Sequence, residues 1–318
     1  MQVELKQQSA TRKMQSAYLA DKAARYIFLI CAILLIAVII GVFLFVGANA
    51  FRVFREGATV PGFFFGTKWD PTGATDANGN PTFGAGGLIL GSLVITFLSV
   101  LIATPLAFGM ALFFTELCPQ WLANILQPLI EIFTGMPSVV IGFLGLVVLV
   151  PFLQKLVGPI EHLPTAGFGW GAATLVLIVM ILPTIISVSI DALRAVPNSV
   201  REASLALGST RWQMMINAVI PAATTALATA VILGLARAIG ETLAVSLVLF
   251  GSDLPKNLFT IFVFFQPNVN ITQLIATDFG EASGPARDAY WTLAFILLVI
   301  SFLFVCVSRY LASRSVYK

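Results

Sequence analysis

The chain has 318 residues, of which 58% are hydrophobic and 10% are charged, whereas an ordinary soluble domain has roughly 45–50% apolar and about 25% charged residues. This small number of charged side chains cannot cover the surface of a water-soluble globule of this size. The composition therefore excludes a soluble enzyme and a disordered chain, and it predicts an apolar surface that faces lipid. The net charge of +3 is too small to indicate a nucleic-acid partner.

Cysteine and histidine are too few and too scattered to build a metal site. Cys31, Cys118 and Cys306 lie far apart in the chain, and the single histidine, His162, is near none of them. Neither a zinc spacing nor a disulfide framework can be assembled from these positions. We therefore expect no metal site and no metal cofactor in this chain.

Six apolar stretches have the length of a membrane-spanning helix, which needs roughly 20 mostly apolar residues. We therefore expect an all-α membrane protein with six transmembrane helices. The stretches are 27–48, 88–114, 129–153, 170–190, 217–250 and 290–311.

The distribution of basic residues predicts the orientation of the chain. With the N-terminus in the cytoplasm, eleven Lys and Arg fall in inside segments and six in outside segments. This bias favours both termini inside. The resulting division is a cytoplasmic segment 1–26, a first span 27–48, an external loop 49–87, a core of five spans 88–311 and a cytoplasmic tail 312–318. The core includes the cytoplasmic segment 191–215 and the external loop 251–289.

Both long outside loops carry distinctive patterns. Residues 70–73 and 78–81 of the first loop are turn formers, which indicates an external segment rather than another span. The second loop contains the apolar run 258–265, which is too short to cross a bilayer. This run is expected either at the membrane interface or packed on the helix bundle.

Three prolines, Pro105, Pro137 and Pro183, interrupt apolar spans and are expected to kink them. Kinked helices suit a bundle that rocks between inward and outward openings. Glu116 and Glu131 lie near the predicted inner ends of the second and third spans, where solvation at the membrane interface is sufficient to account for them.

The segment 191–215 is the most informative inside segment. Pro197 should end the preceding helix, and Ser199 with Glu202 has the spacing of a capping box that begins a new one. Gly208 can adopt the left-handed conformation that ends this short helix, and Ser or Thr at 209–210 can cap the next. Taken alone, this pattern also fits an ordinary solvated helix between two spans.

The same segment resembles the EAA motif of ABC-importer permeases. Glu202-Ala203-Ser204 is followed by Gly208 six residues after the glutamate and by Pro221 nineteen residues after it. The third position departs from the motif, since Ser204 stands where the family has alanine. The resemblance implies that the short helix docks on a cytoplasmic ATPase, with Glu202, Ala203 and Gly208 as the coupling residues.

The chain contains no G-x-x-x-x-G-K-[ST] motif that could hold ATP phosphates. We therefore expect that it is not an ATPase and that ATP and magnesium bind to a partner subunit.

Arg237 and Glu241 are two charges inside the predicted fifth span. A charge at the centre of a bilayer costs at least about 2.5–3.5 kcal/mol, so such residues normally face a bundle interior or a wet path. Their spacing would place both on one face of a continuous helix. They could form a structural ion pair, or Arg237 could guide an anion while Glu241 prevents overly tight binding. Residue chemistry leaves both possibilities open.

The stretch from Gly234 to Thr242, GLARAIGET, resembles the G-x-x-R-A-x-G-E-T segment of phosphate ABC-importer permeases. Residues 131–142 and 66–71 resemble further segments of that family, and the loop around Trp69 favours its PstC-type subunit. The resemblance implies a six-helix bundle of the MetI-like type I class and a phosphate path that includes Arg237, Glu241 and Thr242. Thr134, Gly135 and Ser138 could also present donors to an anion, although a purely structural kink beside Pro137 explains that region too.

The resemblance also implies an assembly in the bacterial inner membrane. The expected partners are a PstA-type permease, two PstB-type ATPase subunits, a periplasmic phosphate-binding protein, phosphate and membrane lipid. Two other functions stay open: a permease for another oxyanion, such as sulfate or molybdate, and an ion-driven secondary transporter that works without an ATPase.

Overall fold

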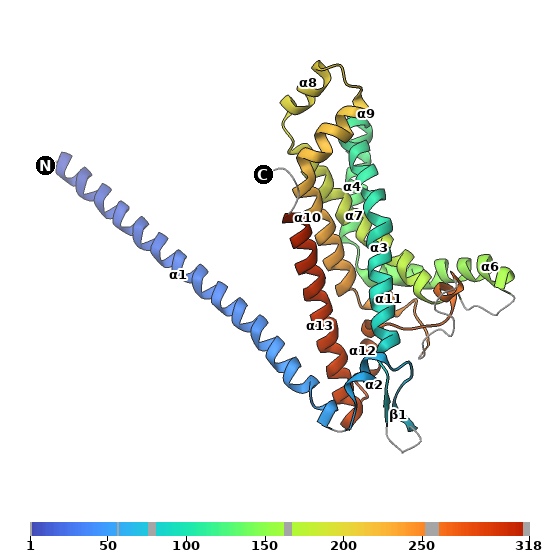
Figure 1. The fold of residues 1–318 in the computed structure, drawn as a ribbon. Helices are drawn as coiled ribbons and strands as arrows, with labels where there is room; N and C mark the ends of the chain where they lie inside the picture. Colours follow the sequence, from blue (N-terminus) through green and yellow to red (C-terminus); the bar gives the residue numbers. More distant parts are fainter. Residues whose placement is uncertain (1, 56, 76–80, 162–166, 252–260, 314–318) are drawn as a thin grey trace. The chain divides into compact units, whose positions relative to one another are not determined.

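The computed structural model describes residues 2–55, 57–75, 81–161, 167–251 and 261–313, and most of them are helical (Figure 1). Within this part of the chain six helices are long and apolar enough to cross a membrane, which confirms the predicted number of spans. They are Asp21–Arg55, Gly86–Leu117, Ser138–Gly158, Trp170–Arg194, Arg211–Gly240 and Gly284–Tyr310. The chain divides into two compact units, residues 1–49 and 50–318. The orientation of the termini stays a prediction.

Helix α1 (Gln2–Ala50) provides the first unit. It is one uninterrupted helix of 49 residues, or about 70 Å at 1.5 Å per residue. The predicted first span, 27–48, carries no charged residue and lies in its second half. The more polar residues 2–26 continue the same helix.

The second unit opens with a small subdomain between the first two spans, which contains the only strands among the described residues. Its elements are η1 (Val53–Arg55), α2 (Val60–Phe65), β1 (Trp69–Thr75) and β2 (Pro81–Phe83). The strands are antiparallel, with Trp69 opposite Phe83. Residues 70–73 therefore belong to an irregular strand and not to a turn, while the second predicted turn lies mostly outside the described residues. Apolar side chains of this subdomain pack against the start of α13.

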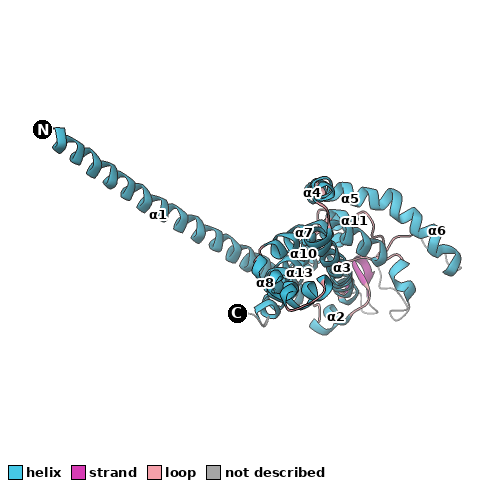
Figure 2. Ribbon diagram, turned by 90° about the horizontal axis from the view of Figure 1, so that it is seen from above, coloured by secondary structure: helices cyan, strands magenta, loops and turns pink. Residues whose placement is uncertain are grey.

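Four helices form the core of the second unit: α3 (Gly86–Leu112), α7 (Trp170–Arg194), α10 (Ile220–Gly240) and α13 (Gly284–Ser313). Helix α7 packs against α3 and α10, and Figure 2 shows these helices side by side from above. In α7, 67% of the most apolar stretch is buried, more than in any of the other spans. Helix α3 faces α7 with small buried residues every fourth position, Ser99, Ala103, Ala107 and Ala111, which allow close approach. It ends in a π turn, η2 (Phe113–Leu117).

The third span is interrupted, so the prediction of one helix over 129–153 is wrong. Helix α4 (Gln120–Gly135) stops, and α5 (Ser138–Leu144), η3 (Gly145–Leu149) and α6 (Val150–Glu161) follow. Met136 between them is extended, with φ −64° and ψ 136°. Pro137 explains the break because it has no N–H to donate and pushes the preceding residue out of the helical region.

The fifth span is also interrupted, so the prediction of a continuous helix over 217–250 is wrong. Helix α10 ends at Gly240, Glu241 is extended with φ −77° and ψ 127°, and the short helix α11 (Leu243–Ser246) follows. The Glu241 carboxylate accepts the backbone N–H of Ala244 at 2.9 Å. Such a local side-chain bond offers the backbone an alternative to continuing the helix.

The segment that is predicted to lie inside forms two short helices around a glycine corner. They are α8 (Asn198–Ala206) and α9 (Arg211–Met214), and the π turn η4 (Met215–Val219) follows. Gly208 has φ +82°, as predicted. The capping box predicted at Ser199 is wrong, because α8 already begins at Asn198 after Pro197. A capping box does form at the next helix, between Thr210 and Gln213.

The loop before the last span packs on the bundle through η5 (Ile261–Phe265), where the rings of Phe264 and Trp170 lie 6.5 Å apart. The apolar run 258–265 was predicted either at the membrane interface or packed on the bundle, and its described part is packed on the bundle. Residues 258–260 lie outside the described chain. The loop continues into α12 (Ile271–Asp278), and its polar residues Asn268 and Asn270 are buried.

Candidate functional site

Arg237 lies in the last turn of α10, where its partly buried guanidinium is held by neutral oxygen atoms from two other helices. Its Nη1 donates to the hydroxyl of Thr184 in α7 at 2.9 Å. Nη1 and Nη2 also lie 3.5 and 3.4 Å from the carbonyl oxygen of Thr134, at the end of α4. The guanidinium thus joins α10, α7 and the interrupted third span.

The contact with Thr184 gives the depth of Arg237 in the bundle. Helix α7 runs from Trp170 to Arg194, and Thr184 is the fifteenth of its 25 residues. A helix of that length covers about 37 Å, slightly more than the hydrocarbon core of a bilayer. The guanidinium therefore lies near the middle of the most buried span, although it ends its own helix.

Glu241 does not pair with Arg237. The break after Gly240 places Glu241 outside α10, so the predicted shared helical face does not exist. Among the described residues, no carboxylate oxygen lies within 4.0 Å of the Arg237 guanidinium. The structural ion pair, one of the two interpretations of this sequence, is therefore contradicted. Arg237 keeps a positive charge that its neighbours leave uncompensated.

The short helices that follow the two breaks, α5 and α11, pack against each other. A Cβ atom on Gly142 of α5 would lie 2.6 Å from the Cα of Ala244 in α11, so only glycine permits this approach. Ser138 begins α5 and Thr242 precedes α11; both are partly buried. No hydrogen bond joins either of them to Arg237 within the described chain. Paired interruptions of this kind provide backbone groups that a continuous helix would have satisfied, as in ion-binding transporter sites.

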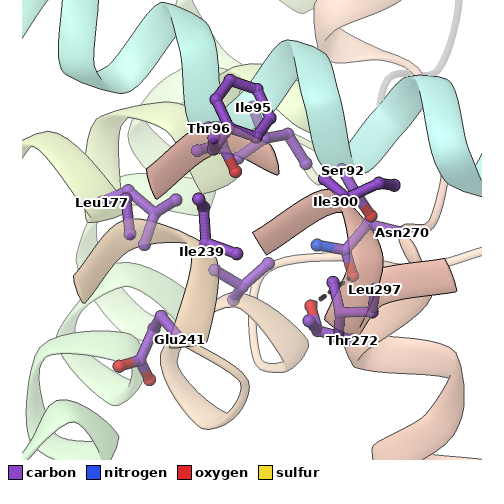
Figure 3. A pocket seen from close by; sticks show the side chains of 13 residues that line it. Ser92, Ile95, Thr96, Leu177, Ile239, Glu241, Asn270, Thr272, Leu297 and Ile300 are labelled. Atoms are coloured by element: carbon purple, nitrogen blue, oxygen red, sulfur yellow. Dashed lines mark hydrogen bonds between the residues drawn. The ribbon is translucent and has the colours of Figure 1, made fainter. Parts of the chain in front are cut away.

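Glu241 also lines a small cavity of about 10 Å³, which is shown in Figure 3. The other polar side chains around it come from α3 and from the start of α12: Ser92, Thr96, Asn270 and Thr272. Such a volume suits about one water molecule. The side-chain Oδ1 of Asn270 accepts the Thr272 hydroxyl and the Gln273 N–H at 2.9 and 2.8 Å, and the side-chain amide nitrogen points toward the cavity (Figure 3).

The coupling residues that the sequence predicts lie on an exposed corner. Glu202 and Ala203 are exposed on α8, and a Cβ added to Gly208 would meet no atom within 4 Å. Leu207 beside the corner is 90% exposed. Ser204, which occupies an alanine position of the EAA motif, bonds the Ser209 hydroxyl at 2.8 Å and so closes the corner. The segment therefore presents an exposed, partly apolar surface.

Glu116 is not a solvated interfacial residue, as its sequence position had suggested. Its Oε1 accepts two hydrogen bonds from Arg201 of α8, from Nε at 3.0 Å and from Nη2 at 2.9 Å. The Glu116 side chain is 9% exposed. No local sequence pattern could have revealed this pair, because 85 residues separate its members. The same is true of Thr184, whose contact with Arg237 spans 53 residues.

Comparison with known proteins places this architecture in a family. Residues 103–317 match the family described as binding-protein-dependent transport system inner membrane component. The chain is 40% identical to the probable ABC transporter permease protein YqgH of Bacillus subtilis (strain 168), over 94% of this chain and 93% of that protein. It is 35% identical to the phosphate transport system permease protein PstC of Pasteurella multocida (strain Pm70), over 90% of this chain and 89% of that protein.

Solved structures agree with this assignment at the level of the fold. A bacterial alginate ABC transporter in complex with an alginate-pentasaccharide-bound periplasmic protein matches with a TM-score of 0.58 and 16% identity, over 90% of this chain and 94% of that chain. The inward-facing MetNI methionine ABC transporter matches with a TM-score of 0.56 and 20% identity, over 73% of this chain and 95% of that chain. The chain is therefore a multi-pass membrane protein that belongs to the family of binding-protein-dependent transport system inner membrane components.

Proposed function

We propose that this chain is a permease subunit of an ATP-driven phosphate importer and forms part of the phosphate path. The observation that carries the proposal is Arg237, a cation at the middle of the bundle. Hydroxyl and carbonyl oxygens hold it, and no carboxylate of the described residues does. The similarity of this chain to the PstC proteins, which are phosphate transport permeases by name, supports phosphate as the anion.

Arg237 would act as a transient partner for the anion. A guanidinium stays charged at any accessible pH and presents planar paired donors that match the oxygens of phosphate. Its present partners are neutral, so an incoming phosphate could replace them with a charge-assisted bond. Glu241, held by the Ala244 N–H at the neighbouring break, would repel the anion and keep its stay short. Thr242 and Ser138 complete the proposed path at the two interrupted helices.

The chain would carry out no covalent reaction of its own. In this proposal two PstB-type ATPase subunits bind ATP and magnesium and move the corner formed by Glu202, Ala203 and Gly208. A PstA-type permease completes the path as a heterodimer partner, and a periplasmic phosphate-binding protein delivers phosphate to the external loops. The complex would lie in the bacterial inner membrane with both termini of this chain in the cytoplasm.

The experiment that tests this function is uptake by the complete importer in lipid vesicles. We expect ATP-dependent uptake of labelled phosphate, which excess unlabelled phosphate should suppress. Excess sulfate or molybdate should change this uptake less than twofold relative to uptake without a competitor. Strong suppression by sulfate or molybdate would assign the path to another oxyanion. Phosphate uptake that persists with an inactivated ATPase would indicate an ion-driven secondary transporter instead.

A further inference from the structure

Helix α8 packs lightly on the spans, through contacts with the π turn η4 and through one inward-facing polar side chain, Arg201. None of its residues is buried, and its apolar contact with the core is limited to the partly buried Val200. Arg201, by contrast, turns away from the exposed coupling face, and its side chain is 17% exposed. Arg201 precedes Glu202 directly, so the coupling face and this inward anchor are adjacent in the chain.

The Arg201 guanidinium bonds two different spans at once. Nε and Nη2 donate to Oε1 of Glu116, in the π turn that ends α3. Nη2 also donates to the carbonyl oxygen of Leu193 at 2.8 Å, and Nη1 donates to that of Val196 at 2.6 Å. The Leu193 carbonyl lies in the last turn of α7 and also accepts the backbone N–H of Val196 at 3.3 Å, whereas the Val196 carbonyl lies two residues beyond the end of α7. The partial negative charge at the C-terminus of a helix favours a cation at this place.

This arrangement has the properties of a stiff connection. The guanidinium is planar and its donors have a fixed geometry, so several bonds at once restrict its position more than a single lysine ammonium would. The low exposure of both side chains reduces screening by salt. The π turn at Glu116 adds to this argument, since such turns often occur at functional positions.

We propose that Glu116 and Arg201 are positioning residues that transmit movement of α8 to α3 and α7. The inference rests on the proposed function, in which a separate ATPase moves the corner at Glu202. Helix α7 carries Thr184, which bonds Arg237. A displacement of α8 therefore reaches the phosphate path along α7, with Arg201 as the connection at its inner end.

A double-mutant cycle in the reconstituted importer tests the link. The variants are Arg201→Gln, Glu116→Gln and the two combined, and the measured quantity is phosphate imported per ATP hydrolysed. We expect each single variant to lower this ratio about fivefold or more while the complex assembles and hydrolyses ATP, as a typical coupling free energy implies. Residues that act through each other should not be additive, so the double variant should match the more affected single variant.

The matched control is Arg194→Gln. Arg194 is an exposed arginine at the same end of the bundle, and its bond to Gln127 is 3.3 Å long. This variant should keep the ratio within twofold of the native value. An unchanged ratio in Arg201→Gln and Glu116→Gln, or fully additive losses in the double variant, would overturn the proposal. Should Arg201→Gln fail to assemble, Arg201→Lys keeps the charge and should give a smaller loss of coupling.

A second measurement separates this proposal from the proposed function, because it needs no phosphate. Spin labels are placed at the exposed residues Leu207 and Leu175, beside α8 and on α7, in a chain whose three cysteines are replaced. In the labelled protein that keeps Glu116 and Arg201, binding of an ATP analogue to the complex should leave the distance between the two labels unchanged. In the labelled Arg201→Gln variant, the same analogue should change this distance. Equal behaviour of the two proteins would reject the link, whereas failure of phosphate uptake alone would reject only the proposed substrate.

Discussion

Arg237 is the residue whose surroundings decide the mechanism. Two unit charges 4 Å apart interact by about 4 kcal/mol at an effective dielectric constant near 20, so a paired carboxylate would cancel much of its attraction for an anion. The neutral oxygens of Thr134 and Thr184 orient the guanidinium without that cancellation. The break after Gly240, which removes Glu241 from the helical face of Arg237, is thus what keeps the cation available.

Replacing Thr184 by valine tests how Arg237 is oriented. Valine has nearly the shape of threonine but cannot accept the bond from Nη1, which is 2.9 Å long. A hydrogen bond to a charged group contributes about 1.5–3 kcal/mol, so we expect phosphate uptake to fall about tenfold or more while assembly is preserved. Thr229→Val is the control, because Thr229 is exposed and bonds only within α10, to the Thr225 carbonyl. Equal uptake by the two variants would remove Thr184 from the mechanism.

At the scale of elements, the contact between α5 and α11 depends on Gly142. An added methyl group would lie 2.6 Å from the Cα of Ala244, which is backbone and cannot move aside cheaply. Gly142→Ala should therefore lower stability by about 1–3 kcal/mol, the usual effect of overpacking, seen as a lower melting temperature of the purified protein. Gly109→Ala should not lower it, because a Cβ at Gly109 of α3 meets no atom within 4 Å. A lower melting temperature in both variants would show that the α5–α11 contact is not the cause.

The glycine corner between α8 and α9 should fail for a different reason. A Cβ at Gly208 meets no atom within 4 Å, so the effect of a substitution there comes from its φ of +82° alone. Gly208→Val should strain the backbone by about 1–2 kcal/mol and lower phosphate imported per ATP hydrolysed. Gly208→Asn should retain coupling, because asparagine tolerates this conformation. Loss of coupling in both variants would instead show that coupling requires a residue without a side chain at position 208.

At the scale of the whole molecule, hydropathy is sufficient to predict six spans, because each needs about 20 apolar residues whatever its neighbours. Hydropathy alone does not predict the interruptions at Met136 and Glu241. Pro137 indicated the first one from the sequence, although only as a kink, whereas the second depends on a side-chain bond to a single N–H. The spacing of residues in the sequence cannot predict the pair of Glu116 and Arg201, because the packing of α3, α7 and α8 brings the two residues together. Arg237 itself could be singled out from the sequence, whereas its partners could not.

In the proposed mechanism, the exposed corner at Glu202 receives movement from the ATPase and Arg201 connects this corner to α7 and α3. Helix α7 in turn carries Thr184, which bonds the guanidinium of Arg237. Because α7 is the most buried helix of the core, a shift at its inner end cannot be absorbed locally without disturbing its packing.

The most direct test of this account is phosphate uptake by the assembled importer with Arg237→Gln, which removes the charge but keeps a side chain able to bond Thr184. We predict that uptake is lost while the complex assembles with normal stoichiometry, and that Arg287→Gln, which changes an exposed arginine stacked 5.8 Å from the Phe279 ring centre, imports phosphate normally. Normal uptake by the assembled Arg237→Gln importer would contradict the central claim that this cation carries the anion through the bundle.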